Sequence, residues 1–454
     1  MRLKIAAYAS AVIAVAALVV MGPLQAGESA LKVGIYPYVP RPQQFKTAIQ
    51  TSWEALHPDV ELVFDDTWDG GYDMTPPDDL DVFVFDAMML ENFRASGYLE
   101  PMQASEVKGL DDFISYAING VKYGDQYVAI PQLGCASILF YKKNDAPIAA
   151  AKDIGDLKTA LGQCTYTSQV PPDVRGMMID MQGGSTNAAL YLDIAHSYNG
   201  RYPLPLPPTQ GDLNATVIGG MKTLLTTSSF WNATQSPSAD YGRGAWFSQG
   251  YGRVLVGYTE HMSAMSPQTR SQIGFKPLPM ADSNHPPLFY ADVIGVNTKT
   301  NSRGTRALAV ELANLMASTA TMVASIGPGD DQDYPQYLMA TRNSIFQQLG
   351  ANFPIYNDMY AMVQAANPVM FKLSSDSRTW LNDMKNVIRS QARSNYACGC
   401  DHVAATMIGS NSMAPAICTP TCAAYGGWNG QWTNAQPAAP VGKSVCGCNS
   451  CNMP

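Results

Sequence analysis

The residue best placed for nucleophilic chemistry is Cys135. It lies just before the β-prone run at 138–141, and only Cys164 accompanies it outside the cysteine-rich C-terminus. Such isolation is typical of a free thiol, although a buried, inert cysteine is the commoner case. Pro131 and Gly134 predict that one extended segment breaks there before the next begins. A thiol attacks as its thiolate, so Cys135 would need a base or a neighbour that lowers its pKa.

Carboxylates follow or end several predicted strands. Glu260 comes directly after one of them and is the best candidate base, with His261 as the alternative because imidazole is the usual choice. Asp86 ends a second predicted strand and Asp292 lies in a third. Open α/β sheets bind ligands at the carboxyl ends of their strands, which favours a shared site. Tyrosines recur near the same strand ends, namely Tyr36, Tyr38, Tyr72, Tyr241, Tyr258 and Tyr290.

Taken singly, each of these acids could be a solvated loop residue or a helix cap, and each tyrosine could belong to the core. Together, aromatic faces and carboxylates suit a flat, cationic heterocycle through stacking and charge pairing. The five histidines are scattered, with no HxxxH or HExxH pair. The sequence also has no GxSxG, phosphate-loop or dinucleotide-binding motif. We therefore expect neither a metal nor an organic cofactor.

The elements that must position these residues alternate between strands and helices. The segment 31–40 is predicted to begin as a strand and to end in a proline-containing loop, and further strands are predicted at 60–64, 80–86, 177–180, 253–258 and 289–297. Helices are predicted at 43–56, 88–96, 110–121, 147–166 (a pair), 188–198, 213–226, 306–318 and 322–326. Alternation of this kind indicates an α/β fold, and extended crossings after residue 130 and near 290 favour two lobes. Gly183-Gly184 before a helix could cradle an anion, or could simply form a capped turn.

Composition limits the class of partner. The chain of 454 residues carries 29 Lys and Arg against 37 Asp and Glu, a formal charge of −8, with no basic block. Nucleic acid is excluded on this basis, because its binding depends on clustered basic residues.

The N-terminus predicts export. A basic start, Met1-Arg-Leu-Lys4, precedes an apolar run at 5–21 and small residues at 26 and 27. This is the pattern of a secretory signal peptide, here residues 1–26, although an uncleaved membrane anchor is the alternative. We expect a secreted or periplasmic protein, in which the seven cysteines after residue 397 are free to form disulfides.

Several separate motifs between about residues 30 and 390 resemble thiaminase I (thiamine pyridinylase). The resemblance implies a two-lobed fold similar to type II periplasmic binding proteins, with a central cleft. The motifs are Ile35-Tyr-Pro-Tyr-Val-Pro40, Leu80-Asp-Val-Phe-Val-Phe-Asp-Ala-Met-Met-Leu-Glu-Asn-Phe93, the Cys-containing strand before Tyr141, Arg243-Gly-Ala-Trp-Phe247, Gly250-Tyr-Gly-Arg253, Gly257-Tyr-Thr-Glu260 and Leu288-Phe-Tyr-Ala-Asp-Val-Ile-Gly295.

The resemblance also implies an activity. Members of that family cleave thiamine at its methylene bridge and transfer the pyrimidine to an amine or thiol base. By position in the motifs, Cys135 matches the family nucleophile and Glu260 its acid/base residue. Asp86 and Asp292 match carboxylates that hold the aminopyrimidine. The residues that match tyrosines of the family's cleft are Tyr38, Tyr72, Tyr241, Tyr258 and Tyr290.

The C-terminal segment resembles a mannan-binding lectin module, through Cys418-Thr-Pro-Thr-Cys422, Gly427-Trp-Asn-Gly-Gln-Trp432 and Ser444-Val-Cys-Gly-Cys448. The resemblance implies that Trp428 and Trp432 stack on mannose-type sugars. A small disulfide-linked tail without a ligand is the alternative, and a zinc site is less favoured because the Cys-x-Cys spacings are tight. Seven tail cysteines leave one without a partner in the chain, the pairing stays open, and Cys398 and Cys400 have no assignment.

The predicted organisation is therefore a signal peptide (1–26), a two-lobed catalytic domain (27–395) and a Cys-rich module (396–454). Within the catalytic domain one lobe comprises about 30–138 with 288–345, and the other 139–287. We expect a monomer that acts on thiamine and a base. A non-catalytic solute-binding protein for thiamine or a related cation is the rival interpretation, and a carbohydrate-anchored factor in which the tail dominates is a third.

Overall fold

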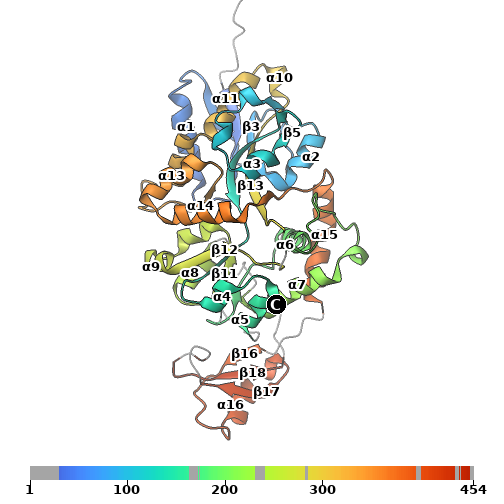
Figure 1. Ribbon diagram of the computed structural model, residues 1–454, viewed down its shortest axis with the longest axis vertical. Helices are drawn as coiled ribbons and strands as arrows, with labels where there is room; N and C mark the ends of the chain where they lie inside the picture. The colour runs from blue at the N-terminus through green and yellow to red at the C-terminus, as the bar shows by residue number, and fades with distance from the viewer. Residues whose placement is uncertain are drawn as a thin grey trace, which may run out of the picture.

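The computed structural model describes residues 30–162, 172, 174–230, 241–281, 285–394, 400–434, 439 and 441–449. Figure 1 shows two α/β lobes stacked along the long axis, with a small C-terminal module beyond the second lobe. The predicted signal peptide, Cys164 and Cys398 lie outside the described residues. Within those residues no single helix is long and apolar enough to cross a membrane, and only a helix pair bent by 55° passes that test together.

The first lobe contains a seven-stranded mixed sheet in the order β14-β7-β13-β3-β1-β2, with β15 beside β13. Its strands are β1 (Ala30–Gly34), β2 (Glu61–Phe64), β3 (Val82–Asp86), β7 (Ile130–Cys135), β13 (Leu288–Val296), β14 (Met339–Ala340) and β15 (Val369–Met370). A smaller sheet comprises β4 (Met102–Gln103), β5 (Lys122–Tyr123) and β6 (Gln126–Tyr127). The helices of this part are α1 (Pro42–Glu54), α2 (Leu90–Ala95), α3 (Ser115–Gly120), α10 (Thr300–Arg303), α11 (Arg306–Met316), α12 (Thr319–Ile326), α13 (Asn343–Asn352) and α14 (Ile355–Ala366).

The centre of the first lobe is formed by the buried strand β3 and by helix α1, which has one buried face. All five residues of β3 are buried, as expected for an apolar strand covered on both faces. In α1 a proline occupies the first turn, and Phe45, Ile49 and Trp53 recur every four residues to form its buried face.

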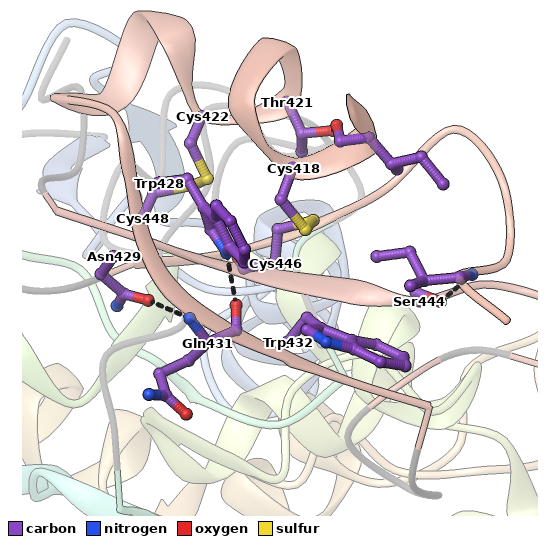
Figure 2. The surroundings of a disulfide bond; sticks show 12 residues. Cys418, Thr421, Cys422, Trp428, Asn429, Gln431, Trp432, Ser444, Cys446 and Cys448 are labelled. Carbon is purple, nitrogen blue, oxygen red and sulfur yellow. Dashed lines mark hydrogen bonds between the residues drawn. A yellow bond between two sulfur atoms is a disulfide. The ribbon is translucent and has the colours of Figure 1, made fainter. Parts of the chain in front are cut away.

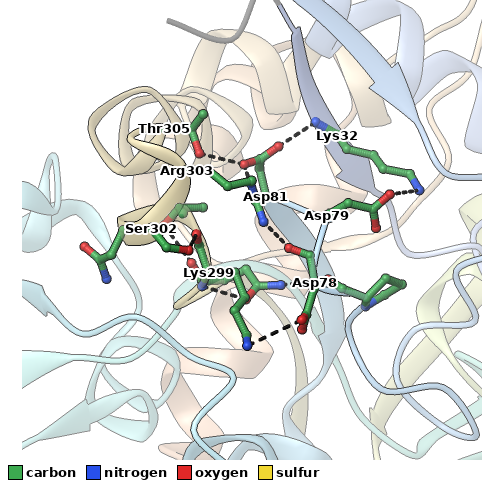
Figure 3. Close-up of polar contacts among 12 residues, drawn as sticks. Lys32, Asp78, Asp79, Asp81, Lys299, Ser302, Arg303 and Thr305 are labelled. Carbon is green, nitrogen blue, oxygen red and sulfur yellow. Dashed lines mark hydrogen bonds and ion pairs between the residues drawn. The ribbon is translucent and has the colours of Figure 1, made fainter. Parts of the chain in front are cut away.

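A buried carboxylate ties these strands together. Asp81 accepts hydrogen bonds from the Lys32 backbone N–H (2.9 Å), the Thr305 hydroxyl (2.8 Å) and the Arg303 guanidinium (Figure 3). The network joins β1, the start of β3 and the turn after α10. A buried charge is tolerated because its lone pairs are satisfied.

The second lobe contains a five-stranded sheet in the order β10-β9-β11-β8-β12. Its strands are β8 (Ile138–Lys142), β9 (Met177–Met178), β10 (Ser228–Phe230), β11 (Val254–Gly257) and β12 (Ile273–Pro277). Its helices are α4 (Ala146–Ala150), α5 (Ile154–Leu161), α6 (Gly184–Asn199), α7 (Ala215–Thr226), α8 (Gly242–Ser248), α9 (Pro267–Gln272) and α15 (Ser377–Arg393), which returns to pack against α6 and α7.

The lobes are joined where strands pass from one sheet to the other. β7 of the first sheet leads to β8 of the second through Ala136 and Ser137 alone, and the chain returns between β12 and β13. The predicted break at Pro131 and Gly134 is wrong, because β7 runs unbroken to Cys135. A register shift opposite Asp292 and Val293 marks a bulge that admits Pro131, which has no N–H to donate.

One predicted helix is also interrupted. Residues 110–121 form a short 3-10 turn and then α3, with Phe113 and Ile114 extended between them. Phe113 bridges to Arg342, and the Ile114 N–H donates to the Thr341 carbonyl (2.8 Å). Pairing with a distant segment has therefore outweighed the local helical pattern.

The C-terminal module is a three-stranded antiparallel sheet, β16 (Cys400–Val403), β18 (Val445–Cys448) and β17 (Trp428–Thr433), covered by α16 (Ala414–Thr421). Two disulfides, Cys418–Cys446 and Cys422–Cys448, connect α16 and the residue that follows it to the central strand (Figure 2). Cysteines four apart on a helix and two apart on a strand each share one face, so two parallel bridges form.

Candidate active site

A cavity of about 520 Å³ lies between the lobes, and side chains of both lobes line it. Every residue that sequence analysis assigned to catalysis or to substrate binding in the catalytic domain is on its wall. They are Cys135, Glu260, Asp86, Asp292, Tyr38, Tyr72, Tyr241, Tyr258 and Tyr290.

The first lobe contributes the thiol through two neighbouring strands. Cys135 is the last residue of β7 and stands opposite Tyr290 of β13 in the antiparallel ladder. Directly opposite residues of such a pair extend from the same face, with Cβ atoms about 5 Å apart. The thiol is partly exposed, and it is the free cysteine among the described residues. The connection to the second lobe begins at the next residue.

Two carboxylates from adjacent strands face the same cavity. Asp292 of β13 is paired with Asp86 of β3. Asp86 accepts hydrogen bonds from the Tyr72 hydroxyl and the Met88 backbone N–H, both at 2.8 Å. Burial raises the pKa of Asp86, while burial and then the charge of Asp86 raise the pKa of Asp292 well above its usual value. The pair is thus poorly solvated and unbalanced in charge, which favours a cationic or hydrogen-bond-donating ligand.

Tyrosines form an aromatic wall next to these acids. The Tyr36 and Tyr72 hydroxyls are 3.0 Å apart, and the Tyr38 ring lies edge-on to both of their rings at 5.5 and 5.8 Å. Tyr38 is 53% exposed. A large aromatic side chain left open at a cavity gives a flat ligand a surface on which to stack.

The second lobe contributes the candidate base. Glu260 follows β11 in the 3-10 turn η6 (Thr259–Ala264), and its side chain is buried. Burial raises the pKa of Glu260 to about 7. A carboxylate with a pKa near neutrality can both take and return a proton under physiological conditions.

The alternative base, His261, has both of its ring nitrogens in contact with other protein groups. Arg243 Nη2 lies 3.1 Å from His261 Nε2, and an arginine can only donate, so Nε2 accepts. The remaining nitrogen, Nδ1, lies 3.1 Å from the Tyr258 backbone nitrogen, whose N–H donates to it, and 3.2 Å from the Tyr258 carbonyl oxygen. Burial and then the Arg243 charge lower the pKa of His261 to about 3. The ring therefore stays neutral with its lone pair occupied, which favours Glu260 as the base.

The electrostatics of the thiol follow from this arrangement. Burial, followed by the charges of Glu260, Asp292 and Asp86, raises the pKa of Cys135 well above its usual value. The free protein therefore holds a protonated thiol at neutral pH. Deprotonation requires a base nearby and a positive charge to offset the surrounding acids.

Sequence analysis missed part of the wall. Asp180, Ser185, Thr186 and Arg243 also line the cavity. Asp180 follows β9, the parallel neighbour of β11, and so reaches the same edge of the sheet as Glu260. Its Oδ1 accepts from the backbone N–H groups of Gln182 (2.9 Å) and Gly183 (3.5 Å). The site of a possible anion before α6 is thus filled by the chain's own carboxylate.

The tryptophans of the C-terminal module lie on β17 (Figure 2). Trp428 Nε1 donates to the Gln431 carbonyl (2.8 Å) and Trp432 Nε1 donates to Asn411 Oδ1 (3.0 Å). Both side chains are partly exposed. Across the described residues, no group of three or more His, Cys, Asp or Glu side chains is arranged to hold a metal ion.

Comparison with known proteins identifies the families that this chain resembles. The profile of the family described as Thiaminase-1 domain matches residues 136–281, and that of the Mannan-binding protein family matches residues 411–448. Thiaminase-1 of Paenibacillus thiaminolyticus is 36% identical over 382 residues, 82% of this chain and 92% of that protein.

Solved structures agree with these matches. Clostridium botulinum thiaminase I, solved in complex with thiamin, superposes with a TM-score of 0.74 and 34% identity, over 80% of this chain and all of that one. The maltose-bound T. maritima MalE3 superposes at 0.55 with 14% identity, over 80% of this chain and 98% of that one, a likeness of fold alone. The two-lobed binding-protein fold predicted from the sequence is confirmed.

Proposed function

The chain belongs to the thiaminase I family, and on this premise we propose that it cleaves thiamine at the methylene bridge through an adduct on Cys135. The pyrimidine would then pass to an amine or thiol base. The observation that carries the proposal is the meeting of a free thiol, a buried glutamate and a pair of carboxylates in one cavity between the lobes.

The cavity suits the substrate in charge and shape. Thiamine joins an aminopyrimidine to a positively charged thiazolium ring. Asp86 and Asp292 can accept hydrogen bonds from the amino group and attract the cation, and Tyr38 offers a face for stacking. The substrate's positive charge lowers the cost of forming a thiolate beside three acids. Thiol deprotonation is thereby linked to substrate binding.

The steps follow from these positions. Glu260 takes the proton of the Cys135 thiol, and the thiolate adds to the pyrimidine ring. The bond between the methylene carbon and the thiazolium nitrogen breaks, and its electron pair stays on the nitrogen, so the thiazole leaves uncharged. The incoming base bonds to the methylene carbon, the sulfur–carbon bond breaks, and the thiolate is regenerated. A base that carries N–H or S–H releases that proton to solvent in this second half, and Glu260 returns its own proton to the regenerated thiolate.

The rival function is capture of thiamine without chemistry, for which the fold and the aromatic cavity would also serve. Cys135→Ser separates the two. It should abolish conversion of thiamine in the presence of pyridine, measured by product mass, and leave thiamine binding by calorimetry within about threefold. Cys164→Ser is the matched control and should turn over normally. Wild-type protein that binds thiamine tightly and yields no product would refute the enzyme and favour the receptor.

For the C-terminal module we propose binding of mannose-type glycans through Trp428 and Trp432, supported by the family match at 411–448 and by the partial exposure of both rings. Trp428→Ala and Trp432→Ala should each weaken retention on immobilised mannan, with thiamine turnover unchanged. Retention equal to that of wild type in both variants would refute the assignment. We also propose export, directed by residues 1–26; an N-terminus of the secreted protein near residue 27 would test it.

A further inference from the structure

A buried carboxylate outside the cavity wall has no part in the mechanism above. Asp193 lies on α6 of the second lobe and is 6% exposed. It lines a second, smaller cavity of about 230 Å³, whose wall also includes residues of two connections between the lobes: Ala136 and Ser137 after β7, and residues 277–281 and 285–289 around the return to β13. A charged group is rarely buried without a partner, so its partner indicates its role.

That partner belongs to the other lobe. Tyr290 of β13 donates a hydrogen bond from its hydroxyl to Asp193 Oδ2 at 3.4 Å. The Tyr290 ring also packs against the buried ring of Phe371, with centroids 4.8 Å apart. Phe371 packs against the ring at an interplanar angle of 41°, and Asp193 holds its hydroxyl tip. The orientation of Tyr290 is therefore fixed jointly by the two lobes.

Tyr290 is in turn a direct neighbour of the thiol. It is paired with Cys135 across the β7–β13 ladder, and both side chains line the larger cavity. Burial and then the Asp193 charge raise the pKa of Tyr290 well above its usual value, so its hydroxyl remains a donor. Burial also raises the pKa of Asp193 to about 7. In either state the carboxyl group offers an oxygen that accepts the bond.

We propose that Asp193 is a positioning residue of the reaction: from the second lobe it holds the Tyr290 hydroxyl, and so fixes the ring beside the Cys135 thiol. The inference rests on the proposed function, because it concerns the same thiol. Loss of the bond would remove the hold of α6 on the hydroxyl and leave the ring positioned only by Phe371 and by the Ser137 side chain. A reacting atom displaced by a fraction of an ångström loses rate more than binding.

The test is a double-mutant cycle in the full-length protein. Asp193→Ala and Tyr290→Phe should each lower kcat for thiamine by about tenfold, the loss expected for one hydrogen bond, with KM changed less than kcat. The double variant should be no slower than either single one, because both remove the same bond. Asp193→Asn keeps an accepting oxygen and should recover most of the rate. Multiplied losses in the double variant, or equal losses in Asp193→Asn and Asp193→Ala, would overturn the proposal.

A control on the same helix separates positioning from stability. Tyr191 of α6 accepts a hydrogen bond from the Asn214 N–H (2.8 Å) and lines neither cavity. Tyr191→Phe should lower the melting temperature without lowering kcat; a loss of kcat there equal to that of Asp193→Ala would refute a specific role.

The same variants remain informative if the wild-type protein does not cleave thiamine, a result that refutes the proposed function alone. The rate at which iodoacetamide alkylates Cys135 then replaces kcat. Asp193→Ala and Tyr290→Phe should alter that rate by the same factor, and the double variant by no more. Alkylation at the wild-type rate in all three would refute the positioning role independently.

Discussion

Asp292 lies directly opposite Asp86 across the β13–β3 ladder, so two buried carboxylates face the cavity from neighbouring strands. Like charges placed opposite each other destabilise a sheet. The arrangement therefore favours function over stability. A proton or a bound cation would reduce the repulsion between the two carboxylates.

Removal of one charge from this pair should weaken thiamine binding. In a Cys135→Ser background, Asp86→Asn should raise the Kd for thiamine by about 10- to 100-fold, the cost of a hydrogen bond to a charged group. Isothermal calorimetry measures it. Asp153→Asn, at the N-cap of α5 and away from the cavity wall, is the control. Equal Kd values for the two variants would show that Asp86 does not contact the substrate.

Glu260→Gln should affect the thiol and the reaction in opposite directions. The charge of Glu260 is one cause of the raised pKa of Cys135, so its loss should move the alkylation of the thiol to lower pH. Turnover should nevertheless fall by about 10²- to 10⁴-fold, because the base is gone. Iodoacetamide labelling against pH and steady-state kinetics give the two results. A variant that stays active would identify another base.

The pH dependence of the wild type follows from the same group. Glu260 accepts a proton only as a carboxylate, and its pKa is about 7. The value of kcat/KM should therefore rise between about pH 6 and pH 8, and this rise should be absent in Glu260→Gln. A rate that is flat across this range in the wild type would contradict the assignment.

The free energy of unfolding should fall with rising pH, in the range where kcat/KM rises. The folded protein holds the Glu260 proton up to a pKa of about 7, whereas the unfolded chain releases it near 4.5. Between these values the folded state binds more protons, so the free energy of unfolding falls as pH rises. Between pH 4.5 and pH 8 the free energy of unfolding of Glu260→Gln should rise by up to about 3 kcal/mol relative to that of the wild type. Urea unfolding at both pH values measures the difference; a constant difference would mean an unshifted pKa.

The disulfides of the C-terminal module should matter to that module alone. Replacing Cys418 and Cys446 together by serine removes a bridge across a 28-residue separation, at a cost of about 3 kcal/mol in stability. Mannan retention should weaken at elevated temperature, while thiamine turnover is maintained. Loss of turnover would show that the catalytic lobes depend on the module.

Much of the site could be predicted from the sequence because its residues follow strands. Asp86, Glu260 and Asp292 lie within or shortly after apolar runs that predict strands, whereas Cys135 was distinguished by its isolation from the other cysteines. The fold followed from the same alternation of strands and helices. The pairing of the module's cysteines could not be predicted, because sequence spacing alone allows several connectivities.

The residues that sequence analysis missed are those whose meaning depends on tertiary contacts. Asp193 is one acid in the middle of a helix, and only the folded chain brings the Tyr290 hydroxyl to it. His261 is of the residue type most often used as a base, yet Arg243, 18 positions earlier, donates a hydrogen bond to its Nε2. Phe113 and Ile114 continued a helical pattern, yet a distant segment draws them into extended pairing.

The two-residue connection from β7 to β8 has a consequence for the order of events. Cys135 is the last residue of β7 in the first lobe, whereas Glu260 belongs to the second lobe. In the proposed mechanism, a pyrimidine bonded to Cys135 would therefore belong to the first lobe alone. Any separation of the lobes between the two halves of the reaction would exchange the thiazole for the incoming base while the pyrimidine stayed bound.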